Sequence, residues 1–155
     1  MKKRYLLFFL VLYFITGCEN QDEIIKNEYI AMKNETFNDK NYKDEELPFD
    51  IVTTVDRINE ELINYKVVIK NPKEDMHDIK AMVVHNFYHE DLFPSIGLFN
   101  EPRKLLVDSN KTEELVLMDR IQTTKNISKL GLQFKIWVEN IDYNGEKKDI
   151  YYKTT

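Results

Sequence analysis

The clearest structural signal in the chain is the stretch Leu130-Gly131-Leu132-Gln133-Phe134-Lys135-Ile136-Trp137-Val138-Glu139. Its apolar side chains fall mainly on alternate positions, so they gather on one side of an extended backbone. This period predicts a β-strand with one buried face. Asn144-Gly145 follows, and this dipeptide favours a tight hairpin turn. The segment 148–153 is therefore expected to pair with this strand.

The same period extends back along the chain to residue 48. Segment 62–70 places four apolar residues on one face: Ile63, Tyr65, Val67 and Ile69. Further strands are predicted at 49–55, 78–85, 103–108 and 113–120, the last two as a hairpin across Asp108-Ser109-Asn110-Lys111. About seven short strands in roughly 100 residues predict an all-β fold, an antiparallel Ig-like or fibronectin-like β-sandwich over residues 48–155.

Three of these segments, 65–72, 79–84 and 111–117, resemble the strands of small Ig-like domains on Gram-positive surface lipoproteins. This resemblance spans about residues 62–118, and it implies a surface-exposed module. The disulfide and tryptophan pattern of antibody domains is missing.

The first residues have the pattern of an export signal. Three basic residues, Lys2 to Arg4, precede the uncharged apolar run from Tyr5 to Ile15. That run gives about 17 Å of helix, too short for a hydrocarbon core of ~30 Å. A basic start, a short apolar run and small residues at the end are typical of a secretory signal peptide.

The end of this segment, Ile15-Thr16-Gly17-Cys18, resembles the lipobox of bacterial lipoproteins. The resemblance implies cleavage between Gly17 and Cys18 and a diacylglyceryl group on the Cys18 sulfur, with no other cofactor. It implies a signal peptide at 1–17 and a chain anchored to the outer face of the bacterial plasma membrane. The lipid bilayer is then the first partner, because two acyl chains suffice for stable anchoring.

Residues 18–47 are interpreted as the lipidated cysteine and an acidic tether. From Glu19 to Leu47 the chain has nine acidic and four basic residues and neither Gly nor Pro. Asp22 to Lys33 has the composition of a short helix, with two acidic residues at its start. If residues 22–36 form a helix that docks on the sheet, the alternative fold is a cystatin-like α+β roll.

Charge and cysteine content exclude several classes of function. The 155 residues carry a net charge of −5, with 22 basic and 27 acidic residues. Loss of the three basic residues in 1–17 makes the remaining chain more acidic still, at −8. Nucleic-acid binding is not expected, because it needs a basic surface. Cys18 is the single cysteine, so neither an internal disulfide nor a free catalytic thiol is expected in the lipidated protein.

The alternative function is metal or small-solute binding by His85, His89, Glu90 and Asp91. A pair of histidines four residues apart shares one face of a helix, and carboxylates can complete a metal shell. These residues follow a predicted strand, however, and Asn86-Phe87-Tyr88 between the histidines does not favour a helix. A metal site is therefore not favoured here.

Trp137 and Tyr151 are the candidate interaction surface. Alternation places Trp137 on the wet face of its strand, and Tyr151 on the wet face of the hairpin partner. Aromatic side chains on an exposed sheet favour a protein interface. The alternative is that the tether or a loop covers them. The loop 87–102 is a second candidate, since its length is unusual for a sandwich.

The sequence contains no nucleophile motif, metalloprotease motif or phosphate-binding loop. An enzyme is therefore not expected. The predicted function is that of a lipid-anchored, non-catalytic binding or accessory module for an envelope or extracellular protein.

Overall fold

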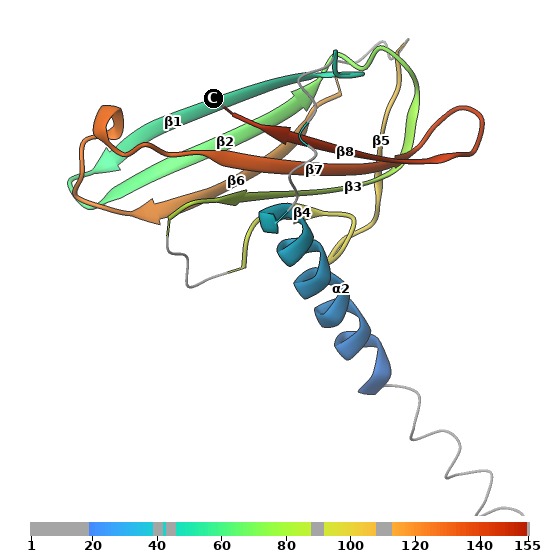
Figure 1. The fold of residues 1–155 in the computed structure, drawn as a ribbon, viewed down its shortest axis with the longest axis horizontal. Helices are drawn as coiled ribbons and strands as arrows, with labels where there is room; N and C mark the ends of the chain where they lie inside the picture. The colour runs from blue at the N-terminus through green and yellow to red at the C-terminus, as the bar shows by residue number, and fades with distance from the viewer. Residues whose placement is uncertain (1–18, 39–41, 43–45, 88–91, 108–112, 155) are drawn as a thin grey trace, which may run out of the picture.

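The fold consists of two antiparallel sheets packed face to face, with one helix against the outside of the larger sheet (Figure 1). The computed structural model describes residues 19–38, 42, 46–87, 92–107 and 113–154. The elements are α2 (Glu19–Asn38), β1 (Asp50–Asn59), β2 (Leu62–Lys70), β3 (Met76–His85), β4 (Ser95–Ile96), β5 (Arg103–Leu105), β6 (Leu115–Gln122), a 3-10 turn η1 (Ile127–Lys129), β7 (Phe134–Ile141) and β8 (Lys147–Lys153).

The smaller sheet has the order β1-β2-β6, and the larger has the order β4-β3-β7-β8 with β5 also paired to β3. This division of the long strands is that of Ig-type sandwiches, in which strands A, B and E face strands C, F and G. The predicted all-β sandwich is confirmed. The hairpin across Asn144-Gly145 is confirmed as well, since β7 and β8 pair along their length.

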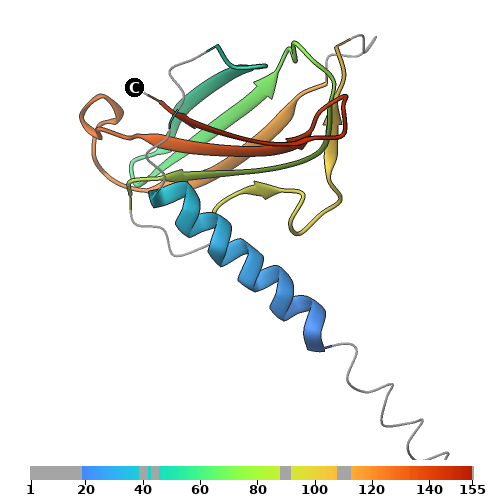
Figure 2. The same ribbon diagram turned by 45° about the vertical axis from the view of Figure 1, so that its right-hand side comes forward.

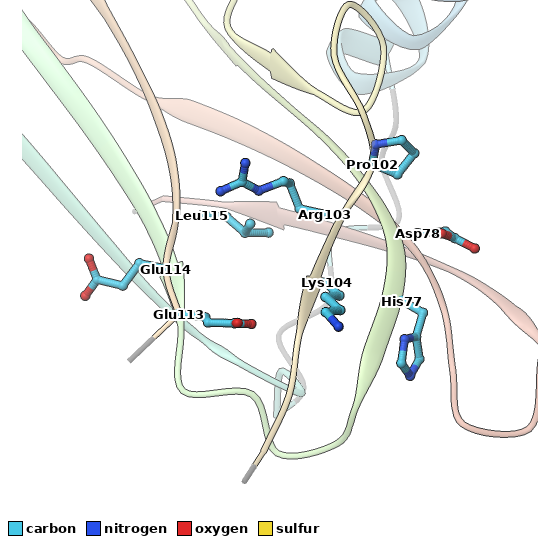
Figure 3. A pocket seen from close by; sticks show the side chains of 8 residues that line it. All are labelled: His77, Asp78, Pro102, Arg103, Lys104, Glu113, Glu114 and Leu115. Atoms are coloured by element: carbon cyan, nitrogen blue, oxygen red, sulfur yellow. The ribbon is translucent and has the colours of Figure 1, made fainter. Parts of the chain in front are cut away.

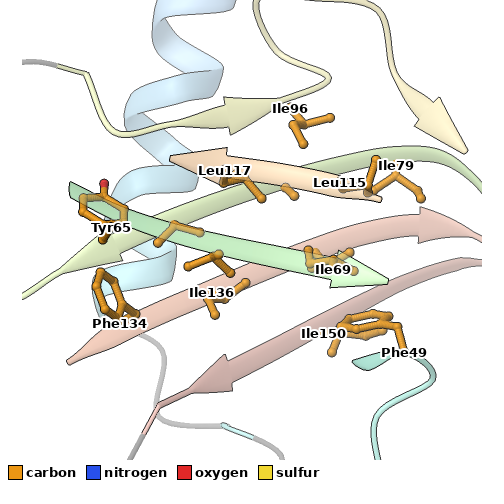
Figure 4. Close-up of a cluster of buried hydrophobic side chains, with 14 of the residues drawn as sticks. Phe49, Tyr65, Ile69, Ile79, Ile96, Leu115, Leu117, Phe134, Ile136 and Ile150 are labelled. Carbon is orange, nitrogen blue, oxygen red and sulfur yellow. The ribbon is translucent and has the colours of Figure 1, made fainter. Parts of the chain in front are cut away.

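The main core fills the space between the two sheets (Figure 4). On β2, the four residues predicted to share one face are all fully buried: Ile63, Tyr65, Val67 and Ile69. Ile136 and Val138 of β7 and Ile150 of β8 meet them from the other sheet. Burial of such apolar side chains contributes about 1.5–3 kcal/mol each, so this layer is the main source of stability.

The expected hairpin between 103–108 and 113–120 is wrong. β5 pairs with β3 in the larger sheet, whereas β6 pairs with β2 in the smaller sheet. The connection therefore crosses from one sheet to the other, as in a Greek key, and a local turn signal does not distinguish these two cases. The turn residues Asp108 to Lys111 lie outside the described residues.

The interpretation of residues 18–47 as a tether is wrong for residues 19–38, which form the 20-residue helix α2. The short helix predicted at 22–33 is confirmed and is longer than expected. Absence of Gly and Pro permits this length, and packing on the sheet stabilises it. The cystatin-like alternative does not apply, because the helix lies outside a two-sheet sandwich (Figure 2).

One core position is predicted to be suboptimal. The Tyr65 hydroxyl is buried with no hydrogen-bond partner among the described residues. We expect Tyr65→Phe to raise the free energy of unfolding by about 1 kcal/mol at neutral pH, because an unpaired buried hydroxyl costs roughly that much. The ring contacts with His85 and Phe134, at centroid distances of 5.2 and 5.0 Å, remain in the variant.

The same substitution changes the response to alkali. Burial raises the pKa of Tyr65 above its ordinary value, so the folded state favours the neutral phenol. The stability that comes from keeping this phenol neutral in the folded state is fully present below the unfolded-state pKa, near 10. It is lost as the pH rises above that value. Urea unfolding from pH 7 to 11 should therefore show a shallower alkaline decline for Tyr65→Phe. Tyr143→Phe is the control, because this side chain is 71% exposed. It should change neither the free energy of unfolding at neutral pH nor its decline at alkaline pH.

Candidate functional site

Trp137 and Tyr151 lie side by side on the outer face of the larger sheet. They are directly paired across β7 and β8, so the prediction that they are neighbours is confirmed. The prediction that they are exposed is wrong, since Trp137 is 5% and Tyr151 9% exposed. The helix covers them: Tyr29 and Met32 of α2 belong to the same buried cluster. The covering segment is the one that the sequence suggested as a tether.

Polar contacts attach the helix at several points along its packed half. The Tyr151 hydroxyl donates a hydrogen bond of 2.6 Å to the Glu35 carboxylate. Lys80 of β3 forms an ion pair with Glu28. The ammonium group of Lys135 donates to the backbone carbonyl of Phe37. Glu28 precedes the buried residues Tyr29 and Met32 in the helix, and Glu35 and Phe37 follow them, so these contacts hold both ends of the packed part of α2 against the sheet.

The loop 92–99 forms a side wall of this interface. The backbone N–H of Phe93 donates a hydrogen bond of 2.7 Å to the Tyr29 hydroxyl. Burial raises the pKa of that hydroxyl, which therefore stays protonated. The Phe93 ring packs edge-on against Phe37 at 5.5 Å, and the Lys33 ammonium lies 5.0 Å from its centroid. The described part of the long 87–102 loop thus has a structural role in seating α2.

The structure places His85 in the core, where it is 1% exposed. Its ring lies within 5.2 Å of Tyr65 and 5.1 Å of Phe93, measured between centroids. His89, Glu90 and Asp91, the other residues of the alternative metal site, lie outside the described residues. Within the described ranges, no three potential ligands come together in one group. An aromatic environment of this kind is typical of a packed histidine.

A gap that the sequence did not indicate opens between β5 and β6. Its volume is about 470 Å³, and its lining carries charges of both signs (Figure 3). The lining residues are His77, Asp78, Pro102, Arg103, Lys104, Glu113, Glu114 and Leu115. Arg103 extends from β5 toward β6, and Glu113 extends toward β5 from the segment before β6, while Glu114 points away (Figure 3). Asp78 sits at a strand irregularity with φ of 47°, which displaces this end of β3 from a regular pairing.

The outer face of the smaller sheet carries a row of valines across β1, β2 and β6, made of Val52, Val68 and Val116. Val52 and Val116 are each 39% exposed, whereas Val68 between them is buried. Met118 on the same face is 59% exposed. Lys66 and Arg120 interrupt this face, so the apolar area is small.

Comparison with protein-family models, with curated proteins and with solved structures finds no match for this chain. Within the described part of the chain, no helix combines the length and apolar character needed to cross a membrane. Gly17 and Cys18, predicted to be the cleavage and lipidation residues, lie outside the described residues.

Proposed function

We propose that this chain is a bacterial lipoprotein, exported and acylated at Cys18. The lipid holds it on the outer face of the plasma membrane. There the sandwich serves as a non-catalytic binding or accessory module for another envelope or extracellular protein. The observation that carries the proposal is that α2 is present from Glu19, the first described residue, and packs on the sandwich. A lipid on the preceding residue would thus be joined directly to the folded domain.

The chemistry of the chain supports lipid anchoring over adsorption to the membrane. After removal of 1–17 the chain has 19 basic and 27 acidic residues, so anionic headgroups repel it on average. Two acyl chains on one sulfur provide stable anchoring without any help from the protein, at about 0.8 kcal/mol for each buried CH₂.

The test is Cys18→Ser in the full chain, expressed in a bacterium that processes lipoproteins. We expect the N-terminal peptide of the unaltered protein to lack residues 1–17 and to carry a diacylglyceryl thioether. The Cys18→Ser precursor should keep residues 1–17, because a hydroxyl does not replace the thiol in acylation. Mass spectrometry of the N-terminal peptide measures both outcomes.

Thr16→Ser keeps a small residue in the lipobox and is the matched control, with processing expected to be normal. If the Cys18→Ser protein matures to the same N-terminus and partitions as before, the proposed anchoring is wrong. The binding role is tested by crosslinking in intact cells, with the same neighbouring envelope protein expected at the unaltered chain and lost with Cys18→Ser.

A further inference from the structure

The helix α2 has two parts with different surroundings. From Gln21 to Asn27 every side chain except Ile25 is exposed, and the described contacts with the sheet begin at Glu28 and Tyr29. The first part therefore projects beyond the sandwich, as both ribbon views show (Figures 1 and 2). Nine residues from Glu19 to Asn27 correspond to about 13 Å of helix.

The second part of the helix is fixed to the sheet. Tyr29, Met32 and Thr36 are buried at 4%, 6% and 0% exposure. The contacts of Glu28, Glu35 and Phe37 with the sheet span the length of this part. The helical hydrogen bonds continue through Asn27 and Glu28 without a Gly or Pro. The projecting turns and the sandwich should therefore move as one body.

We infer that α2 is a rigid strut that holds the sandwich at a fixed height and tilt above a lipid surface. This inference rests on the proposed anchoring at Cys18. The projecting end of α2 then faces the bilayer that holds the acyl chains. The outer face of β1-β2-β6 is on the opposite side of the sandwich from α2, so it remains open to a partner outside the cell.

The side chains of the projecting part suit this role. Asp22 and Glu23 are both exposed, and near anionic headgroups their repulsion disfavours a helix lying flat on the membrane. Ile24, 59% exposed, is the one apolar side chain that is largely exposed there. A helix that lies in the membrane interface needs a continuous apolar face instead.

A strut and a flexible tether respond differently to added length. With a strut, the height of the sandwich above the membrane grows by up to about 1.5 Å for each inserted helical residue. The reach of a flexible spacer grows only with the square root of its length, and it samples a broad range of heights. Seven helical residues add about 10 Å and leave the orientation turned by only about 20°.

The experiment compares two insertions between Glu23 and Ile24, in the exposed part of the helix. One variant receives seven helix-forming residues rich in Ala, Glu and Lys, and the other receives seven Gly and Ser residues. Each variant is purified from membranes in its acylated form and placed in vesicles with dansyl-labelled headgroups. Energy transfer from Trp137, the only tryptophan of the chain, then reports the height of the sandwich.

We expect the helical insertion to lower energy transfer several-fold while the fluorescence decay keeps a narrow lifetime distribution. The Gly and Ser insertion should broaden that distribution, with a smaller change in its mean. Equal transfer and equal broadening in the two variants would overturn the strut but leave the anchor intact. Flotation of the unaltered protein with vesicles is measured first, and failure to float would overturn the anchoring together with the strut.

Discussion

Replacing Trp137 by alanine is expected to lower the free energy of unfolding by about 3–5 kcal/mol, the usual cost of removing a buried indole. Trp137 is 5% exposed and joins the sheet to α2 through the cluster that contains Tyr29 and Met32. A cavity at this point is shared between the helix and the sheet, so neither can close it alone. Against a total stability of 5–15 kcal/mol, this loss is large.

The measurement is urea unfolding followed by circular dichroism, on the chain from residue 18 with Cys18 replaced by Ser. Amide exchange in residues 19–38 should also become faster, since the helix loses its main contact. Trp137→Phe is the conservative control; it keeps an aromatic ring and removes an indole N–H that has no acceptor among the described residues. Met118→Ala, on the opposite outer face, should change stability by less than about 0.5 kcal/mol. A cost this small at Trp137 would show that the helix does not cover it.

The position of Trp137 marks the limit of what the sequence predicted. Alternation fixed which residues share a face, and it correctly separated Trp137 and Tyr151 from the inward set. It did not identify what lies over that face, because the two-residue alternation describes a single strand and carries no information on the layer that packs against it. Contacts between segments more than 100 residues apart, such as Glu35 with Tyr151, have no local signature.

A signal for the covered face was nevertheless present. The runs Ala81-Met82-Val83-Val84 and Ile136-Trp137-Val138 are apolar without interruption. Continuous runs of this kind are typical of strands buried on both faces. All of these residues are buried, with the odd-numbered ones of the first run and the even-numbered ones of the second facing the main core. They indicate a third layer, and α2 supplies it.

The gap between β5 and β6 was beyond prediction for a different reason. Its lining comes from β3, β5 and β6, and the hairpin expected at 108–111 would have closed the space between the last two strands. Because β5 belongs to the larger sheet and β6 to the smaller one, these two strands are not paired and a space is left between them. Sandwich topology, and not any sequence motif, therefore brings the charged residues Arg103, Lys104 and Glu113 to the lining of one gap.

Replacing Gly97 by alanine is expected to lower the free energy of unfolding by about 2–5 kcal/mol. Two costs combine. Gly97 has φ of +80°, and a non-glycine residue in a left-handed conformation costs about 1–2 kcal/mol. A Cβ atom would also lie 2.8 Å from the backbone oxygen of Ile79. Overpacking of this kind costs about 1–3 kcal/mol. The close approach keeps β4 against β3, and Leu98, next in the chain, packs in the cluster beneath α2.

Gly145 provides a matched control, because its φ of +81° is nearly the same and a Cβ atom there would meet nothing within 4 Å. Gly145→Ala should therefore cost only the conformational term, about 1–2 kcal/mol. The difference between the two variants isolates the contact with β3. Thermal or urea unfolding of both proteins measures it, and amide exchange in α2 should increase only for Gly97→Ala. If the two variants lose the same stability, the contact of a Cβ atom at position 97 with the backbone of Ile79 adds nothing to the conformational cost, and the close approach of this loop to β3 is not what requires glycine.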